Sequence, residues 1–520
     1  MPSGIEGMTT AVSTALARYE SLWSASVEMP HYPPLDRDLV TDVVVVGAGI
    51  AGMSVAYHLA EAGHSVVVLD DGPIGGGITS RTSAHLSCAM DNSYTIVESR
   101  RGAEITRLAA ASHLAAIDRI EAIALAEAID CDFERVEGFL FLPPGEKIKT
   151  LEDELEAARR AGAPVKRVPR APLDFFDTGP CIHYANQAQF HPLKYLTGLA
   201  RAIAGRGGRI FGGSHVTRIQ GGKAAHVTAG IHQVHAATIV VATNAPVNDR
   251  VFMMTKMAPY MTYVIGARIP SASVPKGLYW DMDDPYHYVR VHTISTKGEG
   301  PHDILIVGGE DHKTGQAEDT ERRHQRLERW ARRRFPMIEG IEFRWAGQVM
   351  ESVDGLAFLG PNPGRHDNIY IATGDTGMGM THGTIAGILI SDLISERPNP
   401  WADVYDPSRK PVRAAAKFLK ENANVARQYL DWVGPGDEAS LDDIPPGGGA
   451  IVRDGLKKVA AYRDARGIVH EFSAVCPHLG CIVQWNPTER TWDCPCHGSR
   501  FDKRGEVING PSNEDLHRID

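Results

Sequence analysis

The chain has 520 residues, 43% of them apolar and 23% charged, with a formal net charge of −10. This length exceeds one compact core and predicts two or three domains, while an acidic balance without a long basic run argues against nucleic acid as a partner. Without a run of about 18 apolar residues we expect no membrane span, and an N-terminus unlike a secretory signal leaves the cytoplasm as the expected location, with Met8 as an alternative start to Met1.

Residues 1–40 are expected to be an N-terminal extension, with a short helix over 11–24 and a turn-rich segment after it. From residue 41 an apolar strand, a Gly-rich turn, an amphipathic helix and a second apolar strand follow one another, which is typical of one βαβ unit of a parallel sheet. Three isolated cysteines, Cys88, Cys131 and Cys181, are expected to be small buried side chains.

The turn of the βαβ unit carries Gly47, Gly49 and Gly52 in the pattern G-x-G-x-x-G. These glycines permit a tight turn, close approach of a pyrophosphate to the backbone at Gly49 and Ala48, and close packing of helix on strand. Asp70 ends the second strand, where a carboxylate can accept a hydrogen bond from a ribose hydroxyl. A chance Gly-rich turn is the alternative, but strand, motif, helix, strand and acid in this order favour a dinucleotide site.

Further along the chain, helices are expected over 103–129, 147–163, 318–335 and 407–432, mostly strands over 205–245, and antiparallel strands over 258–310. Residues 368–394 return to a strand, a Gly-rich turn and a helix.

Residues 75–86, 238–246 and 370–384 resemble recurring elements of the D-amino-acid-oxidase-like (DAO) family of FAD-dependent oxidoreductases. The resemblance implies non-covalent FAD, an α/β FAD-binding domain (Rossmann-like, glutathione-reductase type) and an inserted mixed α+β substrate domain within residues 41–433. It assigns 41–90, 190–255 and 345–400 to the FAD part, 91–189 and 256–344 to the substrate part, and 407–432 to a C-terminal helix.

The same resemblance implies further FAD contacts at Arg81, Thr82, Ser83, Val216, Gly374, Gly377, Met378 and Gly379. The turn that holds the last four would aim N–H groups and a helix N-terminus at the flavin ring and stabilise negative charge there. Asp70 stands where the family more often has Glu. His85 and Cys88 are near enough for a covalent flavin link, but ordinary packing is the favoured interpretation.

The family oxidises C–H bonds next to nitrogen, which implies an amine or amino acid as the small-molecule substrate. Tyr286, Tyr288 and Arg290 lie in the predicted substrate sheet, where Arg290 could pair with a substrate carboxylate or form a surface ion pair. His382 could act as an acid or base or serve as polar packing. Our candidate catalytic residues are therefore His382, Arg290 and Tyr288. Residues 305–315 are expected to form a loop that returns toward the flavin.

A stretch rich in Gly, Pro and Asp begins near residue 434 and predicts a domain boundary. After it, Cys476-x-His478 and Cys494-x-x-His497 offer four metal ligands in two short loops. A structural zinc is one alternative, although zinc sites usually pair Cys with Cys and His with His. The mixed pairing resembles the Rieske [2Fe–2S] centre, where two cysteines hold one iron and two histidines the other, and implies a small all-β Rieske domain over 434–520.

The resemblance to respiratory Rieske proteins also implies a disulfide between Cys481 and Cys496, with two free thiols as the alternative. Ser499 matches a serine that donates a hydrogen bond to the cluster, whereas Phe501 replaces a tyrosine donor. Because hydrogen bonds to sulfur raise the potential, we expect a potential below that of respiratory Rieske proteins and above that of plant-type ferredoxins. The histidine ligands would form the docking face.

Two redox sites in one chain predict substrate oxidation at FAD and exit of electrons, one at a time, through the cluster to an external one-electron acceptor. The cluster would have to lie near the flavin or swing there on the 434–450 linker. The alternative is an NAD(P)H- or partner-linked reductase that passes electrons via FAD and the cluster to a redox partner.

Overall fold

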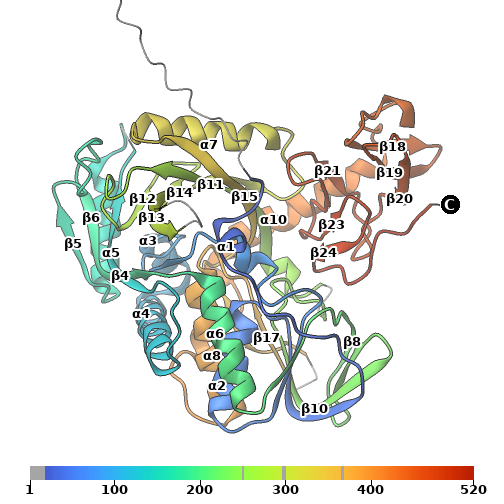
Figure 1. Ribbon diagram of the computed structural model, residues 1–520, viewed down its shortest axis with the longest axis horizontal. Helices are drawn as coiled ribbons and strands as arrows, with labels where there is room; N and C mark the ends of the chain where they lie inside the picture. The colour runs from blue at the N-terminus through green and yellow to red at the C-terminus, as the bar shows by residue number, and fades with distance from the viewer. Residues whose placement is uncertain (1–17, 144, 249–250, 296–299, 365–367, 520) are drawn as a thin grey trace, which may run out of the picture.

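The computed structural model describes residues 18–143, 145–248, 251–295, 300–364 and 368–519. Two large sheets with their helices lie side by side, and two small sheets form a separate C-terminal unit (Figure 1). None of the described helices is long and apolar enough to cross a membrane.

The first large sheet has a parallel centre, with the order β16-β17-β10-β1-β2-β7 and an antiparallel extension of β8 and β9 on β10. Its strands are β1 (Leu39–Val46), β2 (Val66–Leu69), β7 (Arg209–Phe211), β8 (Val216–Gln220), β9 (His226–Ala229), β10 (His232–Val241), β16 (Phe358–Pro361) and β17 (Ile369–Thr373). The apolar run Val43–Val46 is buried, as expected for a parallel strand covered on both faces.

Three helices lie together beside this sheet: α2 (Ile50–Glu61), α6 (Pro192–Gly205) and α8 (Gly379–Ile394) (Figure 1). Helix α8 approaches α2 closely because Gly383 and Gly387 lie at their contact. A Cβ at either glycine would come within 2.8 Å of α2 side-chain atoms.

The second large sheet is mostly antiparallel, with the order β15-β11-β14-β13-β12-β4-β6-β3 and β5 paired to β6. Its strands are β3 (His85–Leu86), β4 (Glu134–Phe141), β5 (Val165–Val168), β6 (Cys181–Gln189), β11 (Met257–Ile269), β12 (Leu278–Asp281), β13 (His287–Ser295), β14 (Pro301–Lys313) and β15 (Gly340–Ser352). Residues 345–352, placed in the FAD part by the resemblance, belong to this sheet because they continue the pairing of β15 with β11.

Helix α7 (Thr320–Arg334) covers the second sheet, and a group of helices lies at its other side (Figure 1). This group comprises α3 (Tyr94–Arg101), α4 (Ala103–Ala126) and α5 (Ile148–Arg160). The segment 305–315, expected as a loop, is mostly the strand β14, and it pairs with β11 and β13.

The N-terminal extension packs into the molecule. Most of the helix expected over 11–24 lies outside the described residues, and a short helix α1 spans Leu22–Ser26. Trp23 in this helix is fully buried, and its indole N–H donates a hydrogen bond to the Thr82 carbonyl oxygen at 2.6 Å. The extension therefore supports the segment that follows the second strand of the βαβ unit.

Helix α9 (Ala402–Tyr405) and helix α10 (Ala415–Gln428) lead to the C-terminal domain, which contains two antiparallel sheets (Figure 1). Their strands are β18 (Gly449–Asp454), β19 (Lys457–Arg463), β20 (Val469–Ser473), β21 (Gln484–Asn486), β22 (Thr491–Asp493), β23 (Arg500–Asp502) and β24 (Val507–Asn509). The segment after residue 433 lies along this domain: Arg453 donates to the Gly434 carbonyl oxygen at 2.7 Å, and Glu438 forms a β-bridge with Val452.

A buried ion triad joins the end of β15 to helix α3 and to the segment after α9. Asp354, just after β15, accepts hydrogen bonds from Arg101 at 2.7 Å and from Arg409 at 2.8 and 2.9 Å. Burial alone would raise the pKa of Asp354, but the two guanidinium groups hold it well below its usual range. The carboxylate therefore stays charged at neutral pH and holds three chain segments together.

We expect Asp354→Asn to destabilise the protein by about 3–5 kcal/mol, because it leaves two buried arginines without their counter-charge. Thermal unfolding followed by circular dichroism at pH 7 should show a transition several degrees lower. Asp442→Asn is the matched control, since Asp442 is fully exposed and lies 3.6 Å from Arg463, a pair worth less than about 1 kcal/mol. Equal effects of the two substitutions would contradict this role.

Candidate functional site

One cavity of about 300 Å³ extends from the C-terminal ends of β1, β2 and β10 to the second large sheet. Asp70 and Val216 line one end, and Tyr286 and Tyr288 line the other. A ligand-sized cavity at the carboxyl ends of parallel strands is where a nucleotide binds in this type of sheet.

The Gly-rich turn of the cavity accepts no side chains at two of its positions. Gly47 has φ +102°, and a Cβ there would lie 2.4 Å from the Ala242 carbonyl oxygen. A Cβ at Gly52 would lie 1.9 Å from the Gly47 carbonyl oxygen. The turn therefore leaves open backbone at the start of α2, where N–H groups and the helix dipole favour a phosphate.

Asp70 shapes this turn from the end of β2. One of its carboxylate oxygens accepts from the Ala48 N–H at 2.5 Å and the other from the Gly72 N–H at 2.8 Å. Burial raises the pKa of Asp70 to about 7. Asp70 also lines the cavity, so its remaining acceptor positions can meet a ribose hydroxyl.

The predicted FAD-binding residues fall into two groups in the structure. Those that line the cavity are Gly47, Gly49, Asp70, Arg81, Thr82, Ser83, Val216, Gly377 and Gly379. The others, Ala48, Gly52, Gly374 and Met378, lie directly behind these and shape the two turns. The cavity thus has a glycine cradle and oriented N–H groups, which fit an FAD molecule.

The second turn precedes α8 and holds His382 in its first helical turn. The His382 Nδ1 lies 2.8 Å from the Asp375 carbonyl oxygen, which can only accept, so Nδ1 carries the proton. Burial lowers the pKa of His382 to about 4, so the ring is neutral near pH 7. Its Nε2 is buried and has no hydrogen-bond partner among the described residues. His382 is one of the residues that line the cavity, and its ring packs 4.6 Å from the His113 ring and 5.6 Å from the Tyr405 ring.

The structure separates the two candidate residues of β13. Tyr288 lines the cavity, and its hydroxyl lies 2.9 Å from the Thr262 hydroxyl. Arg290 does not line it: its fully buried guanidinium donates to the carbonyl oxygens of Ser83 at 3.3 Å and Ala84 at 2.6 Å, and lies over the Trp23 ring. Arg290 therefore supports the backbone of the flavin segment and is not in position to bind a substrate carboxylate.

The isolated cysteines are all buried, as the sequence predicted. Cys88 contacts the Gln187 amide at 3.5 Å, whereas His85 lines the cavity.

The second site lies in the C-terminal domain, where each of two loops contains a turn closed by a hydrogen bond from a glycine N–H to a cysteine carbonyl oxygen four residues earlier. The Gly480 N–H donates to the Cys476 carbonyl oxygen at 3.0 Å, and the Gly498 N–H donates to the Cys494 carbonyl oxygen at 3.1 Å. Both thiols are buried, and the imidazole rings of His478 and His497 lie 5.0 Å apart at 86°.

These four side chains fit a cluster with mixed ligands. His497 Nδ1 is buried and has no hydrogen-bond partner within the described part of the chain. Two thiolates and two imidazoles suit the two irons of a Rieske centre. Both histidine residues are largely buried, at 6% and 7% exposure, so little of either ring is open to a partner, and a docking face formed by these rings stays a prediction.

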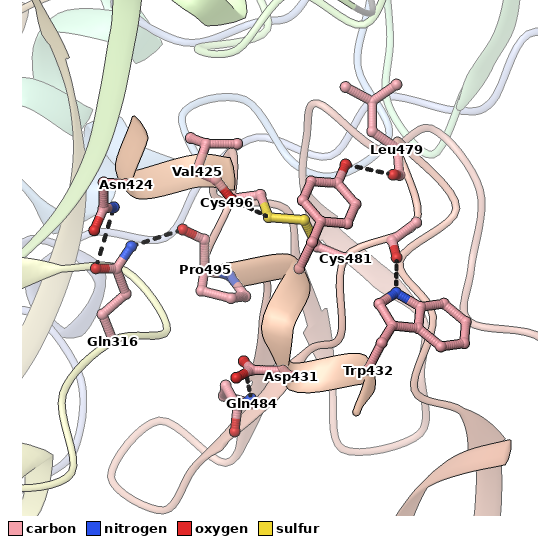
Figure 2. The surroundings of a disulfide bond; sticks show 12 residues. Gln316, Asn424, Val425, Asp431, Trp432, Leu479, Cys481, Gln484, Pro495 and Cys496 are labelled. Atoms are coloured by element: carbon pink, nitrogen blue, oxygen red, sulfur yellow. Dashed lines mark hydrogen bonds between the residues drawn. A yellow bond between two sulfur atoms is a disulfide. The ribbon is translucent and has the colours of Figure 1, made fainter. Parts of the chain in front are cut away.

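Cys481 and Cys496 form a disulfide that joins the two loops (Figure 2). The segment after α10 covers this part of the domain: the Tyr429 hydroxyl donates to the Leu479 carbonyl oxygen at 2.7 Å and the Trp432 indole N–H to that of Gly480 at 2.9 Å (Figure 2).

The C-terminal domain is seated directly on the wall of the cavity. Gln348 on β15 lines the cavity and donates a hydrogen bond to the Gly498 carbonyl oxygen at 2.7 Å. Arg81 forms an ion pair with Glu489 at 2.9 Å, and Asn513 donates to the Val216 carbonyl oxygen at 2.7 Å. The residue that follows His497 in the cluster-binding loop is therefore hydrogen-bonded directly to a side chain that lines the cavity.

Several of these residues have no signal in the sequence. Gln348 and Glu489 act through partners far away in the chain, and nothing in their neighbours marks them. Thr79 caps α2 by accepting from the Ile50 N–H at 3.0 Å, and its place in the 75–86 stretch could have suggested it.

Comparison with known proteins agrees with both sites. The family model of FAD dependent oxidoreductases matches residues 42–393, and that of the Rieske [2Fe-2S] domain matches residues 437–520. The chain belongs to the FAD-dependent oxidoreductases and carries a C-terminal Rieske domain. It therefore holds FAD and a [2Fe–2S] cluster, as the sequence predicted.

Some related proteins match nearly the whole chain, and others match about 72% of it. A Bacillus subtilis (strain 168) protein described as a Rieske 2Fe-2S iron-sulfur protein, YhfW, is 31% identical over 96% of this chain and 97% of its own. Gamma-glutamylputrescine oxidoreductase of Escherichia coli (strain K12) is 29% identical over 72% of this chain and 88% of its own. Glycine oxidase from Geobacillus kaustophilus superposes with a TM-score of 0.60 at 18% identity, over 72% of this chain and 99% of its own, and shares the fold.

We expect Gly52→Ala to yield protein without bound flavin, because the added methyl group overlaps the Gly47 carbonyl oxygen and pushes α2 from its strand. The ratio of flavin to protein absorbance measures this. Gly205→Ala is the control, since nothing lies within 4 Å of a Cβ there. Flavin retention by Gly52→Ala at the level of the control would contradict the assignment.

We expect Ser499→Ala to lower the midpoint potential of the cluster and Phe501→Tyr to raise it. Ser499 accepts from the Ser512 N–H at 2.9 Å and lies within hydrogen-bonding reach of the Cys476 sulfur. Phe501 is fully buried in the same core as Cys476 and Cys494. A redox titration followed by electron paramagnetic resonance compares the three proteins, and a lower potential in Phe501→Tyr would refute the reasoning.

Proposed function

We propose that this FAD-dependent oxidoreductase oxidises the C–N bond of an amine or amino acid and that the electrons leave one at a time through the Rieske cluster to an external acceptor. When bound, FAD accepts two electrons from a substrate carbon and the cluster transfers single electrons. The relatives named for gamma-glutamylputrescine and glycine support an amine-containing substrate.

The observation that supports this proposal most strongly is that residues of the Rieske domain line, or bind residues that line, the flavin cavity. Gln348 lines the flavin cavity and binds the carbonyl oxygen of Gly498, the neighbour of His497. Asn509 and Asn513 of the Rieske domain line the same cavity. A domain fixed in this way needs no swinging linker to exchange electrons with the flavin site.

The oxidation can be written so that atoms and charges balance without any protein side chain taking up a proton. A substrate R₂CH–NH₃⁺ becomes R₂C=NH₂⁺, two protons pass to water, and two electrons pass to two equivalents of a one-electron acceptor. The neutral His382 can accept a hydrogen bond at Nε2, and Tyr288 stays a neutral phenol because burial raises its pKa. We therefore assign these two residues to substrate positioning.

The reductase alternative finds less support. Such a reductase needs a second dinucleotide-binding turn, and the nearest match in the sequence is the stretch 203–210, which runs from the C-terminal end of α6 into β7. A dinucleotide turn follows a strand and opens a helix. Rapid reduction of the flavin by NADH or NADPH would reverse this preference.

The function is tested by anaerobic addition of amines and amino acids to the oxidised holoenzyme. We expect flavin bleaching by at least one substrate, followed by the electron paramagnetic resonance signal of the reduced cluster. Bleaching without cluster reduction would refute the electron route, and no bleaching by any amine would refute the substrate class.

Gln348→Met sharpens this test. It keeps the bulk of the side chain but removes the hydrogen bond to Gly498, so we expect unchanged flavin reduction and slower cluster reduction in stopped flow. Gln316→Met is the control, because Gln316 binds the same loop at the Pro495 carbonyl oxygen at 2.9 Å and does not line the cavity. Equal rates in the two variants would exclude a special role for Gln348.

A further inference from the structure

The end of the cavity that faces the second sheet is walled by aromatic rings. Trp280, Tyr286 and Tyr288 all line it, together with His85. The Tyr286 and Tyr288 rings lie 5.7 Å apart, and His85 lies 5.9 Å from Trp280 and 5.7 Å from Tyr288. Aromatic faces around a small space attract alkylated ammonium groups.

Carboxyl groups lie beside these rings. Asp91 lines the cavity and lies so close to the turn before α8 that a Cβ at Gly377 would come within 2.4 Å of it. Asp311 has a buried carboxylate oxygen without a hydrogen-bond partner among the described residues. The Tyr286 hydroxyl is within hydrogen-bonding reach of both carboxyls. Burial raises the pKa of both carboxyl groups, and a cation that arrives with the ligand would stabilise their charged form.

The described part of the chain supplies no cation to these two carboxyls. Neither Asp91 nor Asp311 takes part in an ion pair there, and the nearby Arg323 is paired with Asp319 at 2.9 Å. Arg81 is the one Arg or Lys among the described residues that line the cavity, and it pairs with Glu489. Arg290, the expected partner of a substrate carboxylate, is held by backbone carbonyl oxygens outside the cavity.

We propose that this end of the cavity binds the substrate as an ammonium cation and rejects amines that carry an adjacent carboxylate. The cation pocket consists of Asp91, Trp280, Tyr286 and Tyr288, which line the cavity; Asp311 is within hydrogen-bonding reach of Tyr286 but does not line it. The rings surround the alkylated nitrogen, and the Asp91 carboxyl balances its charge. The inference rests on the proposed function for the reaction, but binding itself needs no turnover.

The probes are tetramethylammonium chloride, which has no N–H to lose, and sodium pivalate, an anion of similar shape. Isothermal titration calorimetry on the oxidised holoenzyme at constant ionic strength measures both. We expect saturable binding of tetramethylammonium and none of pivalate. Pivalate binding at equal or higher affinity, or no binding of tetramethylammonium, would overturn the proposal.

Two variants remove the two halves of the cation pocket. Asp91→Asn should weaken tetramethylammonium binding about tenfold, the equivalent of about 1.4 kcal/mol, and Trp280→Leu should weaken it about two- to fivefold. Asp174→Asn is the matched control, since Asp174 is 96% exposed beside Arg170. Wild-type affinity in both pocket variants, each with normal flavin content, would overturn the proposal.

The outcomes separate this inference from the proposed function. If no amine reduces the flavin while tetramethylammonium binding still depends on Asp91, the cation pocket stands and the oxidation does not. If amines and amino acids reduce the flavin equally well and Asp91→Asn leaves their KM unchanged, the oxidation stands and the cation pocket does not.

Discussion

The position of the cluster-binding loop depends on a close contact at Gly498 that leaves no room for a side chain. Gly498 has φ +83°, and a Cβ there would lie 2.4 Å from Pro259 and 2.7 Å from the Gln348 amide nitrogen. Its carbonyl oxygen accepts from that amide at 2.7 Å. Because Gly498 follows His497, this contact fixes the cluster-binding loop against the cavity wall. Electron transfer slows steeply with distance, so the fixed seat gives the two redox sites a constant separation.

The sequence revealed those sites whose functional residues all lie close together in the chain. Gly47, Gly49 and Gly52 stand within one turn, so a strand before them and a helix after them were enough to predict the dinucleotide-binding half. The two Cys and His pairs lie in two short loops, and Cys481 and Cys496 stand within the same strings, so a resemblance to Rieske proteins could be recognised there, and that resemblance implied the disulfide.

Arg290 shows where such reasoning fails. Tyr288 and Arg290 are two residues apart on β13, in the predicted substrate sheet, where Arg290 was expected either to bind a substrate carboxylate or to form a surface ion pair. The pattern could not reveal that Trp23, from the N-terminal extension, packs over Arg290, or that the Ser83 and Ala84 carbonyl oxygens take up its guanidinium. Likewise Gln348 and Gly498 are 150 residues apart, and only the docking of two domains brings them together.

The burial of the two histidine ligands gives the cluster an inner and an outer side. On the inner side, Gln348 connects the His497 loop to the flavin cavity. On the outer side, Tyr429 and Trp432 bind the carbonyl oxygens next to His478, and each remains more than a third exposed (Figure 2). Both imidazole rings are buried, so an acceptor that needed direct contact with them would have to displace protein. The segment that binds the carbonyl oxygens of Leu479 and Gly480 leads from α10, which begins the connection between the two domains, so the same part of the chain joins the domains and holds the loop after His478.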